Sequence, residues 1–155
     1  MKSKNFVPIL WIVLISACAN QAPIQSPYLP GLGEFMTQLS YRHGKLWFAG
    51  QAQNWDLAAY ELDEIKEGLS DISTFHPSHH EVKAIPEQIN EHMMTAINLA
   101  AQAIQAKKQK AFTEAYNGIT NGCNSCHQAN GFGFNRIVRP QVNIFTNQQF
   151  NLQIR

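Results

Sequence analysis

The chain has 155 residues, of which twelve are Lys or Arg and eleven are Asp or Glu, so its formal net charge is +1. Nine Gly and seven Pro are spread without a repeat and 45% of the residues are hydrophobic, which is typical of one globular domain with short extensions. No run of like charges is longer than Lys107-Lys108, so the sequence lacks the basic footprint of a nucleic-acid-binding protein. We expect no nucleic-acid partner.

The N-terminus has the layout of a secretory signal peptide. Lys2 and Lys4 give a basic start, and residues 6–15 form an apolar core that is too short to span a bilayer. Small residues follow this core. We therefore predict that residues 1–17 are a signal peptide that is removed on export.

The end of this segment, Leu14-Ile15-Ser16-Ala17-Cys18, resembles the lipobox of bacterial lipoproteins, in which the Cys is lipidated and becomes the first mature residue. The resemblance implies a lipid anchor on Cys18 and, because Ala19 rather than Asp follows, sorting to the outer membrane. An ordinary cleavage site with an incidental Cys18 is the alternative. Residues 18–31, with several prolines and polar residues, read as a lipid-anchored linker.

Four segments then carry apolar residues at the alternating spacings of three and four that are typical of amphipathic helices. Asn54 is a candidate cap for the second helix, Pro86 suits the first turn of the third, and Asn130-Gly131 is a stop signal for the fourth. Short connections favour antiparallel neighbours. We predict an all-α, up-down-up-down four-helix bundle over residues 32–130 and an irregular C-terminal tail over residues 131–155. The expected helices cover about residues 32–49, 54–70, 86–106 and 110–130.

The fourth segment ends in Cys123-Asn124-Ser125-Cys126-His127, the C-x-x-C-H pattern of c-type haem attachment. In this pattern two thiols add to the haem vinyl groups and the adjacent His binds iron from the proximal side. Cys123 and His127 lie four residues apart and so share one face of a helix, while Cys126 reaches the second vinyl group from the same turn. We therefore expect one covalent haem c held by Cys123 and Cys126, with His127 as the proximal iron ligand.

Other readings of the motif have less support. A zinc site would need a second ligand pair at finger-like spacing, and the distant cluster of His76, His79 and His80 matches no closed structural site. A thioredoxin-like dithiol would need a preceding strand, and a plain disulfide does not explain the adjacent His. We interpret the His cluster as part of a polar loop.

A haem motif near the C-terminal end of the last of four helices resembles the layout of cytochrome c-prime and of soluble four-helix b-type cytochromes. The resemblance covers about residues 32–131, although cytochrome c-prime ends sooner after its haem motif. The chain is also similar to a group of bacterial c-type cytochrome lipoproteins, and the similar segments are Gly33-Glu34-Phe35-Met36 and Arg42-His43-Gly44-Lys45-Leu46-Trp47-Phe48-Ala49-Gly50.

The distal side of the iron decides the chemistry. In an up-down-up-down bundle the C-terminal end of the fourth helix lies beside the N-terminal end of the first, where Met36 is located. The four-helix b-type cytochromes use a Met near this position, which favours Met36 as the distal ligand. His43 lies on the same stripe about 10 Å deeper and is the alternative, and an open distal position is the third reading. Four basic residues could pair with the haem propionates, or could simply form a solvated face of the protein. They are Arg42, Lys45, Arg136 and Arg139.

These features predict a monohaem cytochrome that carries single electrons on the periplasmic side of a bacterial membrane. Its expected partners are periplasmic redox proteins and, through the anchor, the membrane itself, and a homodimer is left open. The alternative function is a module that binds or senses gas ligands such as NO or CO, as in cytochrome c-prime. We expect no enzymatic activity, because no nucleophile with a base, paired carboxylates or phosphate loop is present.

Overall fold

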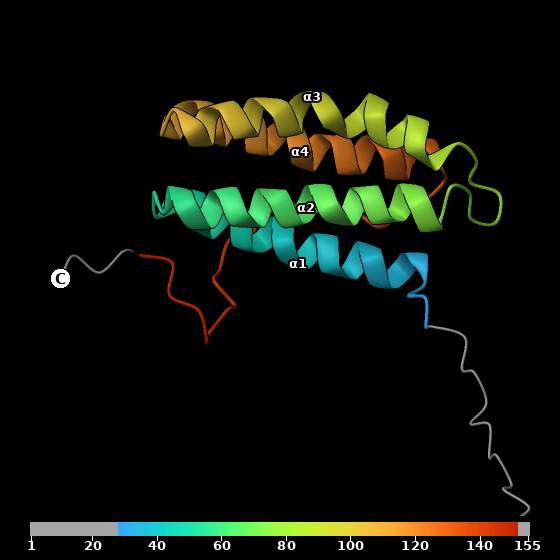
Figure 1. The fold of residues 1–155 in the computed structure, drawn as a ribbon, viewed down its shortest axis with the longest axis horizontal. Helices are drawn as coiled ribbons and strands as arrows, with labels where there is room; N and C mark the ends of the chain where they lie inside the picture. Colours follow the sequence, from blue (N-terminus) through green and yellow to red (C-terminus); the bar gives the residue numbers. More distant parts are fainter. Residues whose placement is uncertain (1–27, 152–155) are drawn as a thin grey trace, which may run out of the picture.

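The computed structural model describes residues 28–151, which form four helices and an extended tail (Figure 1). Consecutive helices run in opposite directions, which confirms the predicted up-down-up-down bundle. The predicted signal peptide, Cys18 and most of the predicted linker lie outside the described residues. The helices are α1 (Leu32–Gln51), α2 (Trp55–Phe75), α3 (Ile85–Gln105) and α4 (Gln109–Ala129).

The ends of the helices follow local sequence signals. Asn54 caps α2, because its Oδ1 accepts a hydrogen bond from the backbone N–H of Leu57 at 3.2 Å. Pro86 lies in the first turn of α3, and Gly131 follows α4 with a positive φ of 79°, which glycine adopts without strain. The second helix continues past the predicted end at residue 70, since Ile72 extends its buried stripe.

The inward stripes of the four helices meet in one hydrophobic core, whose burial supplies most of the stability of such a bundle. Gly122 brings α4 close to α3, because a Cβ at this position would overlap the backbone carbonyl of His92. Gly50 likewise makes room for the ring of Phe112. The largest fully buried side chains are Tyr116, Phe112, Leu46, Ile72, Ile97, Ile119 and Glu61.

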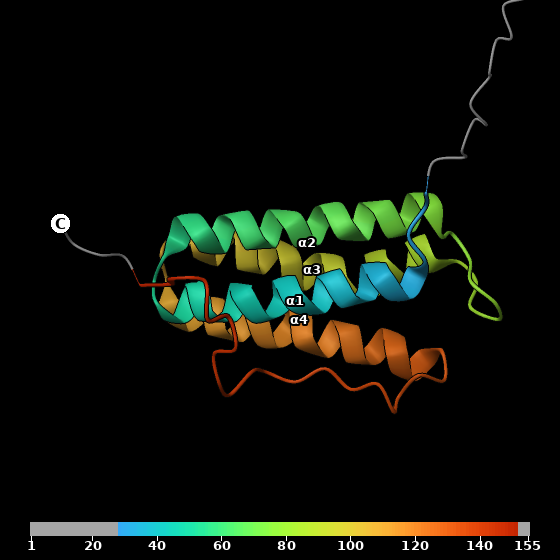
Figure 2. The ribbon, with the colours of Figure 1, turned by 90° about the horizontal axis from the view of Figure 1, so that it is seen from below.

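The tail is irregular, as predicted, but it packs against the bundle. It leaves α4, runs back along this helix and crosses to α1 (Figure 2). The guanidinium of Arg139 lies 4.8 Å from the ring centroid of Trp47, and the ring of Phe145 contacts α1 at Gly44. Near its end the tail is held by Asn54, whose Nδ2 donates a 3.0 Å hydrogen bond to the carbonyl of Phe150.

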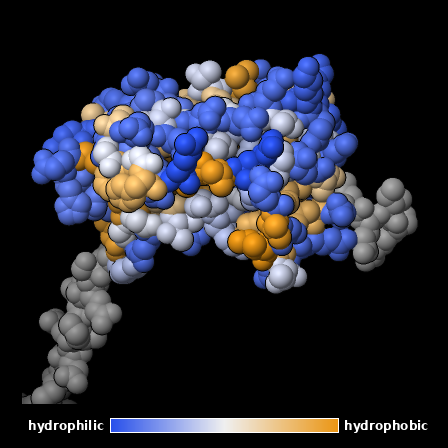
Figure 3. Space-filling view, turned by 180° about the vertical axis from the view of Figure 1, so that it is seen from behind, coloured by the Kyte–Doolittle hydropathy of each residue, from blue (hydrophilic) through white to orange (hydrophobic). Residues whose placement is uncertain are grey.

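The tail lies on the face shown in Figure 3, where apolar groups stand out on a mostly polar surface. Phe145 and Phe150 of the tail are buried, whereas Ile144, next to Phe145, is exposed. The exposed apolar side chains of the tail are Phe132, Phe134, Val138, Val142 and Ile144. The buried side chains of the tail therefore pack against the bundle beside α1 and α4. The exposed apolar side chains of the tail form part of the protein surface.

Candidate functional site

The C-x-x-C-H motif lies on the last turns of α4, where the inward stripe of this helix meets the end of the bundle. Cys123 packs against the core, and Cys126 and His127 are partly buried. The same end of the bundle carries the N-terminus of α1 and the loop between α2 and α3 (Figure 1). The helical placement of the three motif residues follows the sequence prediction.

Both motif thiols are free in the structure. Burial raises the pKa of the Cys123 thiol to about 11, and the nearby Cys126 adds to this effect. Burial also raises the pKa of Cys126, while Asn130, whose Nδ2 lies 3.8 Å from the sulfur, acts in the opposite direction. A reactive thiol-exchange site requires a lowered thiol pKa. The direction of both shifts is opposite to the one that activates such a site.

His127 is oriented by the tail. Its Nδ1 lies 2.7 Å from the backbone carbonyl oxygen of Asn135. A carbonyl oxygen can only accept a hydrogen bond, so Nδ1 must carry the proton and donate it. In the neutral ring, Nε2 then keeps its lone pair. This arrangement is the one that metal-binding histidines adopt, with the second ring nitrogen fixed by a backbone carbonyl.

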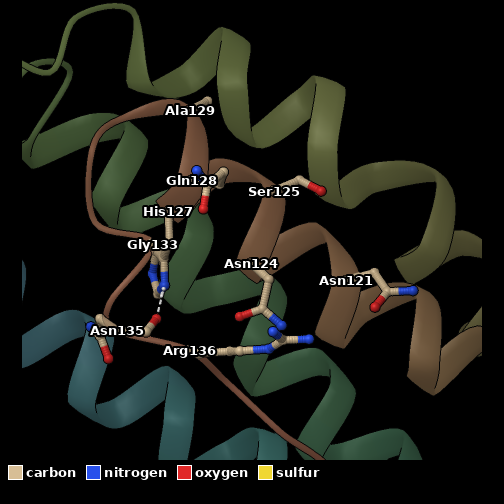
Figure 4. A pocket seen from close by; sticks show the side chains of 9 residues that line it. All are labelled: Asn121, Asn124, Ser125, His127, Gln128, Ala129, Gly133, Asn135 and Arg136. Carbon is tan, nitrogen blue, oxygen red and sulfur yellow. Dashed lines mark hydrogen bonds between the residues drawn. The ribbon is translucent and has the colours of Figure 1, made fainter.

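An open depression of about 680 Å³ lies beside His127, between α4 and the tail (Figure 4). Most of the residues that line it are polar. The residues that line it are Asn121, Asn124, Ser125, His127, Gln128, Ala129, Gly133, Asn135 and Arg136.

His43, the alternative distal ligand, has both ring nitrogens engaged. Only 5% of its surface is exposed, its Nε2 lies 2.8 Å from Oγ1 of Thr120, and its Nδ1 lies 3.0 Å from the hydroxyl of Tyr116. Burial lowers the pKa of His43 to about 4, so the ring is neutral at physiological pH. In this arrangement neither nitrogen is free to bind a metal or to act as a distal acid or base.

Met36 lies level with the C-x-x-C-H motif. The contact of His43 with Thr120 fixes the register between α1 and α4, which run in opposite directions. From His43 to Met36 and from Thr120 to His127 the chain advances by the same two helical turns, or about 10 Å. Met36 is partly buried against the core. Its depth along the bundle is therefore that of the segment between Cys123 and His127.

The basic candidates on α1 have carboxylate partners on α2. The Arg42 guanidinium pairs with Glu64 at 2.6 Å and with the fully buried Glu61 at 3.2 Å. Lys45 lies 3.4 Å from the other oxygen of Glu61. These side chains hold α1 and α2 together and do not reach the motif. Of the basic candidates on the tail, Arg136 lines the depression, whereas Arg139 stacks on Trp47.

The histidine cluster lies in the loop between α2 and α3. His76 Nε2 is 2.9 Å from the carbonyl of Pro30, which ties this loop to the start of α1. Across residues 28–151 no group of three or more His, Cys, Asp or Glu side chains is arranged to hold a metal ion. Haem iron differs from such a site, because the porphyrin supplies most of its ligands and the protein only one or two.

Sequence reasoning missed two residues of the site, Asn124 and Asn135. The side chain of Asn124 and the carbonyl of Asn135 take part in hydrogen bonds between α4 and the tail. The position of Asn124 between the two Cys residues could have indicated a role, because Asn side chains often form hydrogen bonds with backbone groups. Its partner could not be located, because the tail lacks periodicity.

Comparisons with protein-family models, with curated proteins and with solved structures gave no significant match. The function of the site therefore has to follow from its own residues and geometry. Among residues 28–151, no helix combines the length and the apolar character that crossing a bilayer requires.

Proposed function

We propose that this chain is a monohaem c-type cytochrome that carries single electrons. The observation that supports this most strongly is the pairing of the C-x-x-C-H motif with a histidine whose Nδ1 is fixed by the carbonyl of Asn135. The motif needs two thiols and an iron ligand within one helical segment. In the neutral ring, the hydrogen bond to Asn135 places the proton on Nδ1 and leaves the lone pair of Nε2 for iron.

The donor set fits haem c. Cys123 and Cys126 would hold the porphyrin through thioether bonds, and a thiol that is free and protonated is available for this attachment. His127 would bind iron through Nε2. A structural zinc ion would instead need four converging ligands, and in the described part of the chain not even three His, Cys, Asp or Glu side chains are arranged to hold a metal ion.

The distal side favours a carrier over a gas-binding module. Met36 is a thioether at the depth of the motif, and His43 is held by Tyr116 and Thr120. When bound, haem supplies a one-electron couple between ferrous and ferric iron, whose potential is raised by sulfur and imidazole ligation. The chain's own residues orient His127, the proposed proximal ligand, and engage both ring nitrogens of His43.

We further propose that the domain is exported and anchored by a lipid on Cys18, on the periplasmic side of a bacterial membrane. The support is the signal-peptide layout of residues 1–17 and the lipobox resemblance that ends at Cys18. A linker over residues 18–31 would let the domain reach periplasmic redox partners while it stays attached.

Expression of the full chain with c-type maturation machinery tests this function. A denaturing gel stained for haem peroxidase activity should give a band at the mass of the protein, and the double variant Cys123→Ala/Cys126→Ala should give none. Optical spectra of ferric and ferrous protein should show low-spin haem that is unaffected by carbon monoxide. Absence of the stained band in the wild type would contradict haem attachment. Rapid binding of carbon monoxide by a high-spin ferrous form would favour the gas-binding alternative.

A further inference from the structure

The first residue between the two motif cysteines, Asn124, pairs with the tail in both directions. Its Nδ2 donates a hydrogen bond to the carbonyl of Ile137, and its Oδ1 accepts one from the N–H of the same residue, both at 2.8 Å. The amide side chain thus satisfies both backbone groups of one tail residue, as a neighbouring strand would. Ile137 is thereby fixed against α4.

The same stretch of tail holds His127. The carbonyl of Asn135, two residues before Ile137, accepts the 2.7 Å hydrogen bond from the imidazole Nδ1. Residues 135–137 are therefore tied to α4 at both ends, at Asn124 and at His127. Figure 4 shows Asn124, Asn135 and His127 around the same depression, with the bond between Asn135 and His127 drawn as a dashed line.

We propose that Asn124 is a positioning residue for the iron ligand. By holding Ile137, it fixes the direction of the Asn135 carbonyl and so the orientation of the His127 ring and the strength of its Nδ1–H hydrogen bond. The effect at the iron rests on the haem function proposed above. An imidazole that donates a strong hydrogen bond through Nδ1 is a better electron donor, which favours ferric iron and lowers the reduction potential.

The rest of the tail would stay in place without the hydrogen bonds between Asn124 and Ile137. Beyond Ile137 the tail is held by the stacking of Arg139 on Trp47 and by the packing of Phe145, which is only 6% exposed. Replacement of Asn124 should therefore free residues 135–137 without unfolding the bundle. Loss of the two bonds together should favour the locally open form by at least about tenfold.

The test compares Asn124→Leu with Asn121→Leu in the full chain. The control carries the same substitution on the same helix, and Asn121 lines the same depression without taking part in the pair. Trypsin cleavage after Arg136, mapped by mass spectrometry, reports tail opening, because proteolysis follows the population of the open form. The reduction potential of the haem-loaded protein, and the His127 ring tautomer of the haem-free chain read by ¹⁵N NMR, report the effect on the ligand.

We expect Asn124→Leu to be cleaved after Arg136 about tenfold faster than the control, as follows from the loss of two hydrogen bonds. In the haem-loaded protein the potential should rise while haem staining stays unchanged, and in the haem-free chain the population of the Nδ1-protonated tautomer of His127 should fall. Equal cleavage rates in the two variants would show that Asn124 does not hold residues 135–137 of the tail against α4. Faster cleavage with a control-like potential and tautomer would overturn the positioning role. If the wild type takes up no haem, the proposed function fails, and the tautomer alone still decides the role of Asn124.

Discussion

The ring of His43 stacks on the ring of Tyr116, with centroids 4.5 Å apart, and the Tyr116 hydroxyl lies 3.0 Å from His43 Nδ1. This pair joins α1 to α4 in the interior of the bundle. Burial lowers the pKa of His43 to about 4 and raises the pKa of Tyr116. Both side chains are therefore neutral at physiological pH and behave as a hydrogen-bonded part of the core.

Acid should destabilise the protein through His43. Its folded-state pKa of about 4 lies below the ordinary value of 6.5, so the unfolded chain binds a proton first as the pH falls. The contribution to stability is complete above about pH 6.5 and is lost progressively toward about pH 4, amounting to about 3 kcal/mol. Urea unfolding at pH 7 and pH 4 measures this loss.

The variant His43→Gln isolates this effect, because glutamine keeps hydrogen-bonding capacity but does not titrate. We expect its free energy of unfolding to fall less between pH 7 and pH 4 than that of the wild type. His92→Gln, on the partly exposed face of α3, serves as the control and should keep the wild-type pH dependence. An unchanged pH dependence in His43→Gln would assign the acid sensitivity to other groups.

Docking of the tail should contribute measurably to stability through Phe145. This ring is 6% exposed, lies 5.0 Å from the Tyr41 ring centroid, and sits so close to Gly44 that an added Cβ would come within 3.1 Å of its Cζ. Truncation of a buried Phe to Ala typically costs about 3–5 kcal/mol. We expect Phe145→Ala to lower the free energy of unfolding by about 3 kcal/mol, measured in urea.

The neighbouring Ile144 provides a matched control, since it is 75% exposed. Ile144→Ala should change the free energy of unfolding by less than about 0.5 kcal/mol. Similar effects of the two substitutions would show that the tail does not pack as described.

The bundle and the motif could be predicted because both are local patterns. Apolar residues at helical spacing determine which face of each helix is buried, and Ile72 lengthens α2 by the same rule beyond the predicted end. The spacing of Cys123, Cys126 and His127 likewise defines a single helical surface. These features need no knowledge of distant contacts.

The contacts around the site could not be predicted, because they join segments without a shared period. His43 meets Thr120 across 77 positions of sequence, and the sequence alone left His43 open as an iron ligand. The bond between His127 and Asn135 spans only eight positions, but it depends on the path of an irregular tail. Polar partners of this kind follow from the three-dimensional packing, not from propensity.

The lipid anchor gives a prediction that is independent of the bundle. If Cys18 is lipidated, the protein should sediment with membranes, because more than one buried acyl chain gives stable attachment. Cys18→Ser should move it to a soluble or unprocessed form in a fractionation experiment. Cys126→Ser, which leaves the lipobox intact, should still fractionate with membranes. An unchanged distribution of Cys18→Ser would remove the anchor from the proposed function.

Substitution of Met36 and of His43 should show which of the two is the distal ligand of the iron. Met36 lies at the depth of the motif and is only partly buried against the core, whereas both ring nitrogens of His43 are occupied. Met36→Leu preserves volume and shape closely enough to keep the helix packing, and His43→Gln retains a polar group in the interior.

We expect Met36→Leu to convert low-spin ferric haem to high-spin and to lower the reduction potential, because thioether ligation raises it. His43→Gln should leave the optical spectrum of the ferric protein unchanged. If only His43→Gln altered the spin state, α1 would have to slide by about two turns against α4 when haem binds, and the contacts of His43 with Tyr116 and Thr120 would have to break. This slide would also remove the pH dependence assigned to His43, so the spectra and the unfolding measurements check each other.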